Sequence, residues 1–244
     1  DELILRGNCP DWYLEKFKTR MGDEGAILNI SHEHRDLCCL RIIDGENTFV
    51  ENFRLINASG MGIYPTHTKN LYLDRYILHK EEWDEGLVNN SADALHPIAC
   101  SGEIVVKNCI FEGMIDDSLN IHGAFYFANK GDSEGVTCEC AVTYNSGMQG
   151  FFDKGDVIGI FKGNTMELKD RYTVTCVEDA GGRHIKLYTD RPVVCSEGDL
   201  VENLSMQPDI TITNSVFAKA NSHLRFQSRG KIRVFDCRIE LPVL

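Results

Sequence analysis

Val106-Lys107-Asn108-Cys109-Ile110-Phe111 is the stretch that decides the fold, because its pattern recurs along the chain. An apolar residue stands first, a polar residue (often Asn) third and an apolar residue sixth. The pattern starts at positions 50, 73, 106, 212 and 234, so the steps between successive starts are 23, 33, 106 and 22. The other four copies are Val50–Leu55, Leu73–Leu78, Ile212–Phe217 and Val234–Ile239.

The two shortest steps, from 50 to 73 and from 212 to 234, are typical of one coil of a solenoid, whose repeats bury their apolar faces only by stacking on one another. We therefore predict an all-β chain built as a right-handed parallel β-helix, with its coils about 4.8 Å apart. The longer step from 73 to 106 predicts one coil with an added loop between His79 and Asn89. The step from 106 to 212 predicts one coil with an inserted module.

The inserted module is predicted at residues 124–205. Gly-Asp pairs recur there, and three β-branched or aromatic runs follow the alternation of strands, namely Val157–Phe161, Tyr172–Val177 and His184–Tyr188. This favours a small antiparallel β-barrel or sandwich, with irregular coils as the alternative. The predicted domains are a first part of the β-helix at 1–123, the module at 124–205 and a continuation of the β-helix at 206–244.

Composition narrows the classes of function. The 244 residues carry a net charge of −12, which argues against nucleic acid as a partner because phosphates require clustered Lys and Arg. No apolar stretch is long enough for a transmembrane helix, and no signal-peptide pattern is expected in the chain. The ten cysteines form no CxxC pair, and we interpret Cys109 and Cys237 as small buried apolar residues, with disulfide or metal roles as the alternatives. Oligomeric state and cellular location are not indicated.

Two segments carry candidate catalytic groups, Ser91–His96 and Asp116–Gly123. Asp116 follows Asp93 by the same step that separates the repeats at 50 and 73, which is one coil and predicts that the two side chains share a face one rung apart. Asp117 follows directly and would need a turn or bulge to point at the same site. Crowded carboxylates raise the pKa of at least one member, and a protonated carboxyl beside a carboxylate is what glycoside hydrolysis needs.

Two other interpretations of these carboxylates stay open. Paired Asp residues are common at solvated turns, and clustered carboxylates also suit Ca²⁺. We predict no metal. Substrate contacts are predicted at His96, Asn120 and His122 on the rim. They are also predicted at Arg225 and Gln227, which alternate onto one strand face, and at Trp83 in the added loop, where sugar stacking competes with plain packing.

At these residues the sequence resembles glycoside hydrolase family 110, the α-1,3-galactosidases that remove terminal galactose. The resemblance runs in order through five stretches, namely Asn57–Gly62, Ser91–His96, Asn108–Gly113, Asp116–Gly123 and Gln227–Lys231. It implies a β-helix with an inserted module, an inverting mechanism, no cofactor, and Asp93, Asp116 and Asp117 as catalytic residues. It also implies a glycan with terminal α-galactose as partner, and a periplasmic or secreted location.

A looser likeness to polygalacturonases, with an Asp followed one coil later by Asp-Asp, implies a division of roles. Asp116 would be the general acid, and Asp93 with Asp117 would position and deprotonate water. Two alternatives remain. One is a β-helical hydrolase or lyase acting on another polysaccharide, although no basic stripe for a polyanion is evident. The other is a β-helix that binds glycans without catalysis.

Overall fold

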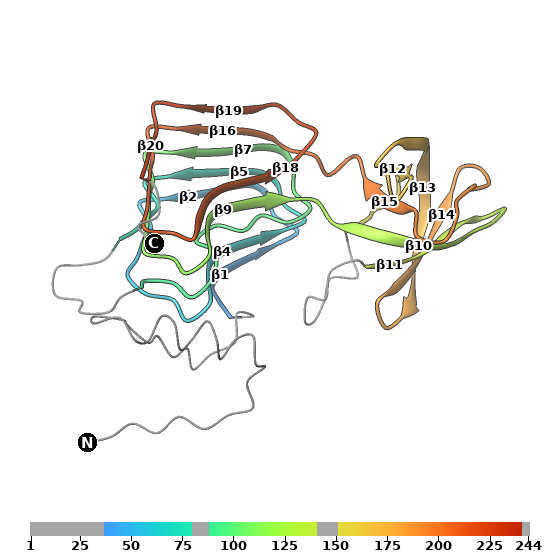
Figure 1. The fold of residues 1–244 in the computed structure, drawn as a ribbon, viewed down its shortest axis with the longest axis horizontal. Helices are drawn as coiled ribbons and strands as arrows, with labels where there is room; N and C mark the ends of the chain where they lie inside the picture. Colours follow the sequence, from blue (N-terminus) through green and yellow to red (C-terminus); the bar gives the residue numbers. More distant parts are fainter. Residues whose placement is uncertain (1–36, 80–87, 141–150, 241–244) are drawn as a thin grey trace, which may run out of the picture. The chain divides into compact units, whose positions relative to one another are not determined.

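The fold is seen in a computed structural model that describes residues 37–79, 88–140 and 151–240. These residues belong to one compact unit, Glu33–Leu244. Their regular secondary structure is entirely β, in parallel sheets and one closed antiparallel barrel (Figure 1). No helix long and apolar enough to cross a bilayer occurs among them. The all-β prediction is confirmed.

One parallel sheet contains the first half of every repeat. Figure 1 shows its five strands stacked in the order β2, β5, β7, β16, β19. The repeats' first residues are register partners from strand to strand, in the row Val50, Leu73, Val106, Ile212 and Val234. The spacing read from the sequence therefore aligns equivalent residues in space. The strands are β2 (Glu46–Glu51), β5 (Lys69–Asp74), β7 (Ser101–Lys107), β16 (Asp209–Thr213) and β19 (Ile232–Phe235).

A second parallel sheet contains the other half of each repeat, in the order β3, β6, β8, β17, β20. The sixth residues again form one row, namely Leu55, Leu78, Phe111, Phe217 and Ile239. The strands are short, with bounds β3 (Arg54–Leu55), β6 (Ile77–Leu78), β8 (Ile110–Glu112), β17 (Val216–Ala218) and β20 (Arg238–Ile239).

The corner between these two sheets explains the polar third residue of the repeat. It has a positive φ in all five copies, at Asn52, Arg75, Asn108, Asn214 and Asp236. Asn and Asp adopt this left-handed region more readily than other non-glycine residues. The corner side chains also bond from coil to coil: Asn214 Nδ2 donates to Asn108 Oδ1 at 2.7 Å, and Arg75 Nε donates to Asn52 Oδ1 at 2.6 Å.

A third wall is made of two strand pairs, β1 (Cys38–Ile43) with β4 (Met61–Thr66) and β9 (Asp117–His122) with β18 (Ser222–Gln227). The segment 88–98 lies between the pairs and joins them through isolated parallel bridges, such as Ile63–Leu95–Leu119. All pairings in this wall are parallel. The wall therefore also stacks residues from successive coils.

Apolar residues of the three walls share one core. At its centre Phe111 stacks on Phe217 with ring centroids 5.2 Å apart and ring planes 4° apart, and the edge of Tyr76 packs against Phe111. Cys109 is buried in the same core, whereas Cys237 in the last coil is partly buried. The prediction of a buried residue is therefore confirmed for Cys109 but not for Cys237. The nine cysteines within the described ranges are free thiols.

Between β9 and β16 the chain forms a closed antiparallel barrel in the order β10-β11-β14-β13-β12-β15. Two of the predicted strand runs lie inside β13 and β14, and the third is β12 itself. Gly155 and Gly198, with φ of 100° and 84°, turn the chain shortly before β12 and β15. The strands are β10 (Phe125–Gly131), β11 (Gly135–Cys140), β12 (Val157–Phe161), β13 (Leu168–Gly181), β14 (His184–Thr189) and β15 (Leu200–Asn203).

Replacing Phe111 with Ala should strongly destabilise the stacked coils. It removes a fully buried ring with two aromatic neighbours, and such truncations cost about 3–5 kcal/mol of unfolding free energy. Phe49→Ala is the matched control, because Phe49 also stacks on a ring, that of Tyr72, but is 64% exposed. Its loss should stay below about 1 kcal/mol. Urea unfolding of both variants measures this, and equal losses would contradict a core centred on Phe111.

Candidate active site

Three aspartates converge at one end of the third wall. Asp93, Asp116 and Asp117 each place a carboxylate oxygen within 4.8 Å of the others. Asp93 belongs to the segment 88–98, Asp117 is the first residue of β9, and Asp116 stands just before that strand. Asp93 and Asp117 are buried, whereas Asp116 is half-exposed. The structure thus brings together the three residues that the sequence singled out.

The register in this wall differs by one residue from the expected one. The bridges Asn90–Met114 and Leu95–Leu119 join residues one position further apart than the repeats at 50 and 73, and the Ala94 amide donates to the Asp117 carbonyl. The coil therefore places Asp93 level with Asp117 rather than with Asp116. Asp117 needs no bulge to reach the site, because it occupies the row of Asp93, and Asp116 reaches the cluster from the turn before β9.

Asp93 is surrounded by donors. Its Oδ2 lies 2.7 Å from Nδ1 of His96 and accepts a hydrogen bond from Asn120 Nδ2 at 3.2 Å, while the Asp117 amide donates to its Oδ1 at 3.2 Å. Burial raises the pKa of Asp93, but the hydrogen bond and charge of His96, with the other two donors, outweigh burial and lower the pKa below its ordinary value. Asp93 is therefore held as a carboxylate.

The pKa of Asp117 is shifted in the opposite direction, above its ordinary value. Burial raises its pKa, and the negative charges of Asp93 and Asp116 raise it further. A hydrogen bond from Ser222 and the charge of Arg225, whose Nη1 lies 3.8 Å from Oδ2, oppose this without cancelling it. Two neighbouring carboxyl groups with pKa values moved apart can supply an acid beside a base.

The two predicted histidines contact each other. Their Nε2 atoms lie 2.8 Å apart, and Nδ1 of His122 donates to the Gly123 carbonyl at 2.6 Å. His96 is only 3% exposed, and both of its ring nitrogens face protein groups. Burial lowers the pKa of His122 to about 4. The imidazoles thus continue the network that starts at Asp93.

The other predicted contacts lie beside this network. Asn120 pairs with Arg225 and His122 pairs with Gln227 across β9 and β18, so these four residues occupy one face. The side chains of Arg225 and Gln227 are exposed there, as the alternation in the sequence indicated. Trp83 lies outside the described residues.

Sequence reasoning missed three supporting residues. Asn90 is buried and holds the Asp93 segment by donating to the carbonyls of Ala92 at 3.1 Å and Asp93 at 2.8 Å. Tyr64 packs its ring edge-on to His96. Ser222 is the register partner of Asp117. Asn90 could have been found from its place just before the Ser91–His96 motif, but the barrel separates Ser222 from Asp117 in sequence and hides their spacing.

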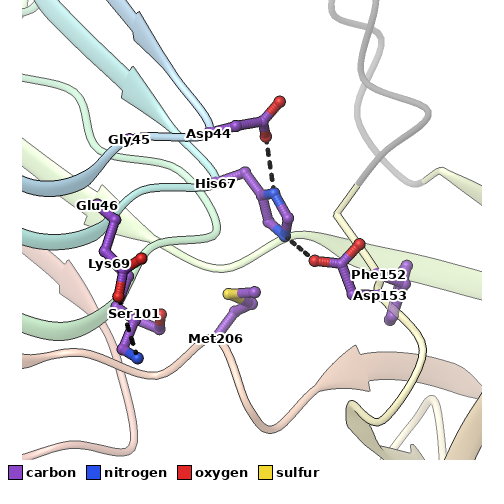
Figure 2. Close-up of a pocket in the computed structure, with 9 residues that line it drawn as sticks. All are labelled: Asp44, Gly45, Glu46, His67, Lys69, Ser101, Phe152, Asp153 and Met206. Carbon is purple, nitrogen blue, oxygen red and sulfur yellow. Dashed lines mark hydrogen bonds and ion pairs between the residues drawn. The ribbon is translucent and has the colours of Figure 1, made fainter.

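A separate cavity of about 570 Å³ contains none of the predicted site residues. Figure 2 shows His67 at its wall between two carboxylates, with Nδ1 2.8 Å from Asp44 and Nε2 3.3 Å from Asp153. Its other lining residues are Gly45, Glu46, Lys69, Ser101, Phe152 and Met206. Its charged groups are of both signs, and it lies apart from the aspartate cluster.

No protein-family model matches the chain. Curated relatives do resemble it. Alpha-1,3-galactosidase A of Bacteroides fragilis (strain YCH46) is 27% identical over 223 residues, which is 90% of this chain and 36% of the relative. Alpha-1,3-galactosidase A of Shewanella woodyi is 26% identical over 85% of this chain and 33% of the relative.

A shorter stretch is more similar. Alpha-1,3-galactosidase B of Parabacteroides distasonis is 39% identical over 80 residues, which is 32% of this chain and 13% of the relative. The chain spans about a third of the length of the curated relatives it matches, 36% for the Bacteroides fragilis protein. These proteins are therefore distant relatives, and the similarity covers only one part of each of them.

Asp→Asn changes at positions 93 and 117 should shift stability in opposite directions at pH 7. A carboxyl with a lowered pKa stabilises the fold above its unfolded pKa of about 3.9, and that contribution is lost as pH falls through the folded value. Asp93→Asn also removes the negative charge that faces Nδ1 of His96 and should cost about 3 kcal/mol of unfolding free energy.

Asp117→Asn should instead raise the melting temperature at pH 7, because ionised Asp117 is buried beside two like charges. Its pKa is raised, so this gain should shrink as pH falls through the folded value and the native carboxyl becomes protonated. Thermal unfolding of both variants between pH 4 and pH 8 tests the pair. A stabilising Asp93→Asn, or a destabilising Asp117→Asn, would contradict the electrostatics described here.

Proposed function

We propose that this chain is the catalytic part of a glycoside hydrolase, an inverting exo-acting α-1,3-galactosidase that removes terminal α-linked galactose from glycans. The observation that carries the proposal is the convergence of Asp93, Asp116 and Asp117, with the pKa of Asp93 lowered and that of Asp117 raised. Glycoside hydrolysis needs such an acid beside such a base. The names of the curated relatives support galactose as the sugar.

We further infer that the fold is a right-handed parallel β-helix, with β-helical parts at 1–123 and 206–244 and an inserted domain at 124–205. The aligned rows in the two five-stranded sheets support this, because strands from successive copies of the repeat are neighbours in each sheet. The antiparallel barrel between β9 and β16 supports the insertion. In this arrangement the coils position the aspartates and the barrel leaves their register undisturbed.

In the proposed reaction a carboxylic acid protonates the leaving oxygen while a carboxylate deprotonates the attacking water. Asp93 suits the base, because its environment keeps it ionised. The likeness to polygalacturonases assigns the acid to Asp116, with Asp117 assisting at the water. The raised pKa of Asp117 makes it a second candidate for the acid.

Inversion is proposed from the family resemblance and not from the carboxyl spacing. Inverting enzymes usually hold the two carboxyl groups about 6.5–9.5 Å apart, with room for a water molecule between them. The oxygens of this cluster lie within 4.8 Å of one another, which is closer. The anomer released first is therefore the decisive measurement, and inversion of an α-galactoside gives β-galactose.

A neutral sugar suits the surroundings of the cluster. The chain has a net charge of −12, which disfavours polyanionic substrates. Arg225 and Gln227 are exposed on the face that holds Asn120 and His122, where they can donate to sugar hydroxyls. Stacking of Trp83 on a sugar ring remains a prediction.

Acid–base chemistry fits the cluster better than Ca²⁺ does. Ca²⁺ takes about six to eight oxygen ligands, whereas this cluster is built from three carboxylates. Both oxygens of Asp93 already face N–H donors, from the Asp117 amide, Asn120 and His96. We propose that the site works without a metal or other cofactor.

Activity of the full chain tests the proposed function. The parent should release galactose from p-nitrophenyl α-galactoside and from a galactose-α-1,3-galactose disaccharide, with the β-anomer appearing first by NMR. Asp93→Asn should lower kcat/KM by about 10²-fold or more. Asp236→Asn is the matched control and should keep parental activity, because the same corner carries Asn at positions 52, 108 and 214 in other coils. No release by a folded parent would sink the proposal.

Two substrates with different leaving groups distinguish Asp116 from Asp117 as the general acid. Loss of the general acid harms a substrate that needs its leaving oxygen protonated much more than one whose leaving group departs unaided. Asp116→Asn should therefore retain more of the parental activity on the p-nitrophenyl galactoside than on the disaccharide, whereas Asp117→Asn should lose both alike. If the reverse pattern appears, Asp117 is the acid.

A further inference from the structure

The contacts of His96 and His122 indicate how many protons the two imidazole rings carry. The Gly123 carbonyl can only accept, so Nδ1 of His122 carries a proton. One proton must lie between the two Nε2 atoms, which are 2.8 Å apart. Nδ1 of His96 lies 2.7 Å from Oδ2 of Asp93, and because a bare nitrogen would repel a carboxylate oxygen at that distance, we infer a further proton at this contact. The charge of the pair then depends on which side of this last contact holds the proton.

The other donors to Asp93 place that proton on the histidine. The Asp117 amide donates to Oδ1, and Asn120 Nδ2 donates to Oδ2, and both favour the ionised carboxylate. The two imidazoles then carry three protons on four ring nitrogens, which is one positive charge. We place the charge on His96 because it is the ring that contacts the carboxylate of Asp93, and burial lowers the pKa of His122 to about 4.

The pair is enclosed, so its charge is little screened. His96 is 3% exposed and Asp93 is 4% exposed. From β4 the ring of Tyr64 packs against His96, and the charged groups on the neighbouring elements are Asp116, Asp117 and Arg225. Arg225 is largely exposed and lies nearest Asp117. Within the described residues, His96 is thus the cation that contacts Asp93.

We propose that His96 carries the excess proton of the pair, that neutral His122 accepts its hydrogen bond, and that both act as positioning residues: His96 forms a fixed counter-cation that keeps Asp93 ionised and oriented. The role of Asp93 as base rests on the proposed function, but the charge on the pair does not. This assigns the two histidines to the support of the aspartate rather than to substrate contacts. His122, by donating to Gly123 and accepting from His96, sets which nitrogen of His96 faces Asp93.

Side-chain ¹⁵N NMR of the labelled full chain tests the charge without any turnover. His96 should show two protonated nitrogens at pH 7, and His122 should show the neutral form with its proton on Nδ1. His96→Asn and His122→Asn assign the signals, and His184→Asn, on the barrel, is the control that should leave both unchanged. Asp93→Asn should remove the imidazolium pattern. A neutral His96 at pH 7 would overturn the proposal.

Kinetics test the positioning role. In His96→Asn the amide can still donate to Asp93, but the positive charge is gone. The acidic limb of the kcat/KM profile should therefore move up by about 1–3 pH units, because Asp93 loses its counter-charge. The double variant Asp93→Asn/His96→Asn should be no slower than Asp93→Asn alone, since His96 acts through Asp93.

An unmoved acidic limb in a folded His96→Asn variant, or a double variant slower by the product of the two single losses, would overturn the positioning role. If the parent hydrolyses neither galactoside, only the proposed function fails. The ¹⁵N pattern of the parent then still decides whether the pair carries its charge.

Discussion

Parallel pairing between strands of successive repeats is the constraint on which the rest of the structure depends. Each strand of the three walls satisfies its backbone N–H and C=O groups mainly through the neighbouring parallel strands, so one repeat cannot be stable alone. The pairing of β7 with β16 shows that this constraint holds even across a long insertion. Val106 and Ile212 are partners although the whole barrel lies between them in sequence. The chain leaves the parallel sheets, forms the closed barrel and returns in register.

The corners make that pairing specific. A left-handed residue at the third position of each repeat turns the chain between two walls at the same place in each coil. Hydrogen bonds such as Asn214 to Asn108 then link corner to corner, while Phe111 on Phe217 does the same inside the core. A slip by one residue would break both ladders and would turn the apolar rows out of the core. The same alignment places Asp93 level with Asp117 in the third wall, because residues in one row are held at the spacing of paired strands.

The aspartate cluster opposes this stability. Burying three carboxyl groups together is unfavourable, and the cost is visible in the raised pKa of Asp117. Asp93 avoids the same shift only because His96, Asn120 and the Asp117 amide surround it with donors. The contrast between the two is useful for chemistry, since one group is kept as a base while its neighbour retains a proton more readily. Sites that need such charges commonly reduce the stability of the fold that holds them.

The sequence by itself determined that the copies of the repeat pair side by side and that the aspartates converge. A period of one coil, combined with the fixed distance between paired strands, leaves little freedom for where equivalent residues lie. It also indicated the barrel strands, because β-branched alternation and Gly-Asp turns are local signals. Only the tertiary structure decided that Asp93 is level with Asp117, through a register one position longer than the repeat, and that Ser222 reaches Asp117 from beyond the barrel. Only the tertiary structure showed that His96 and His122 contact each other. Side-chain direction, burial and the placement of protons depend on contacts between distant segments, and a spacing of residues along the chain does not contain them.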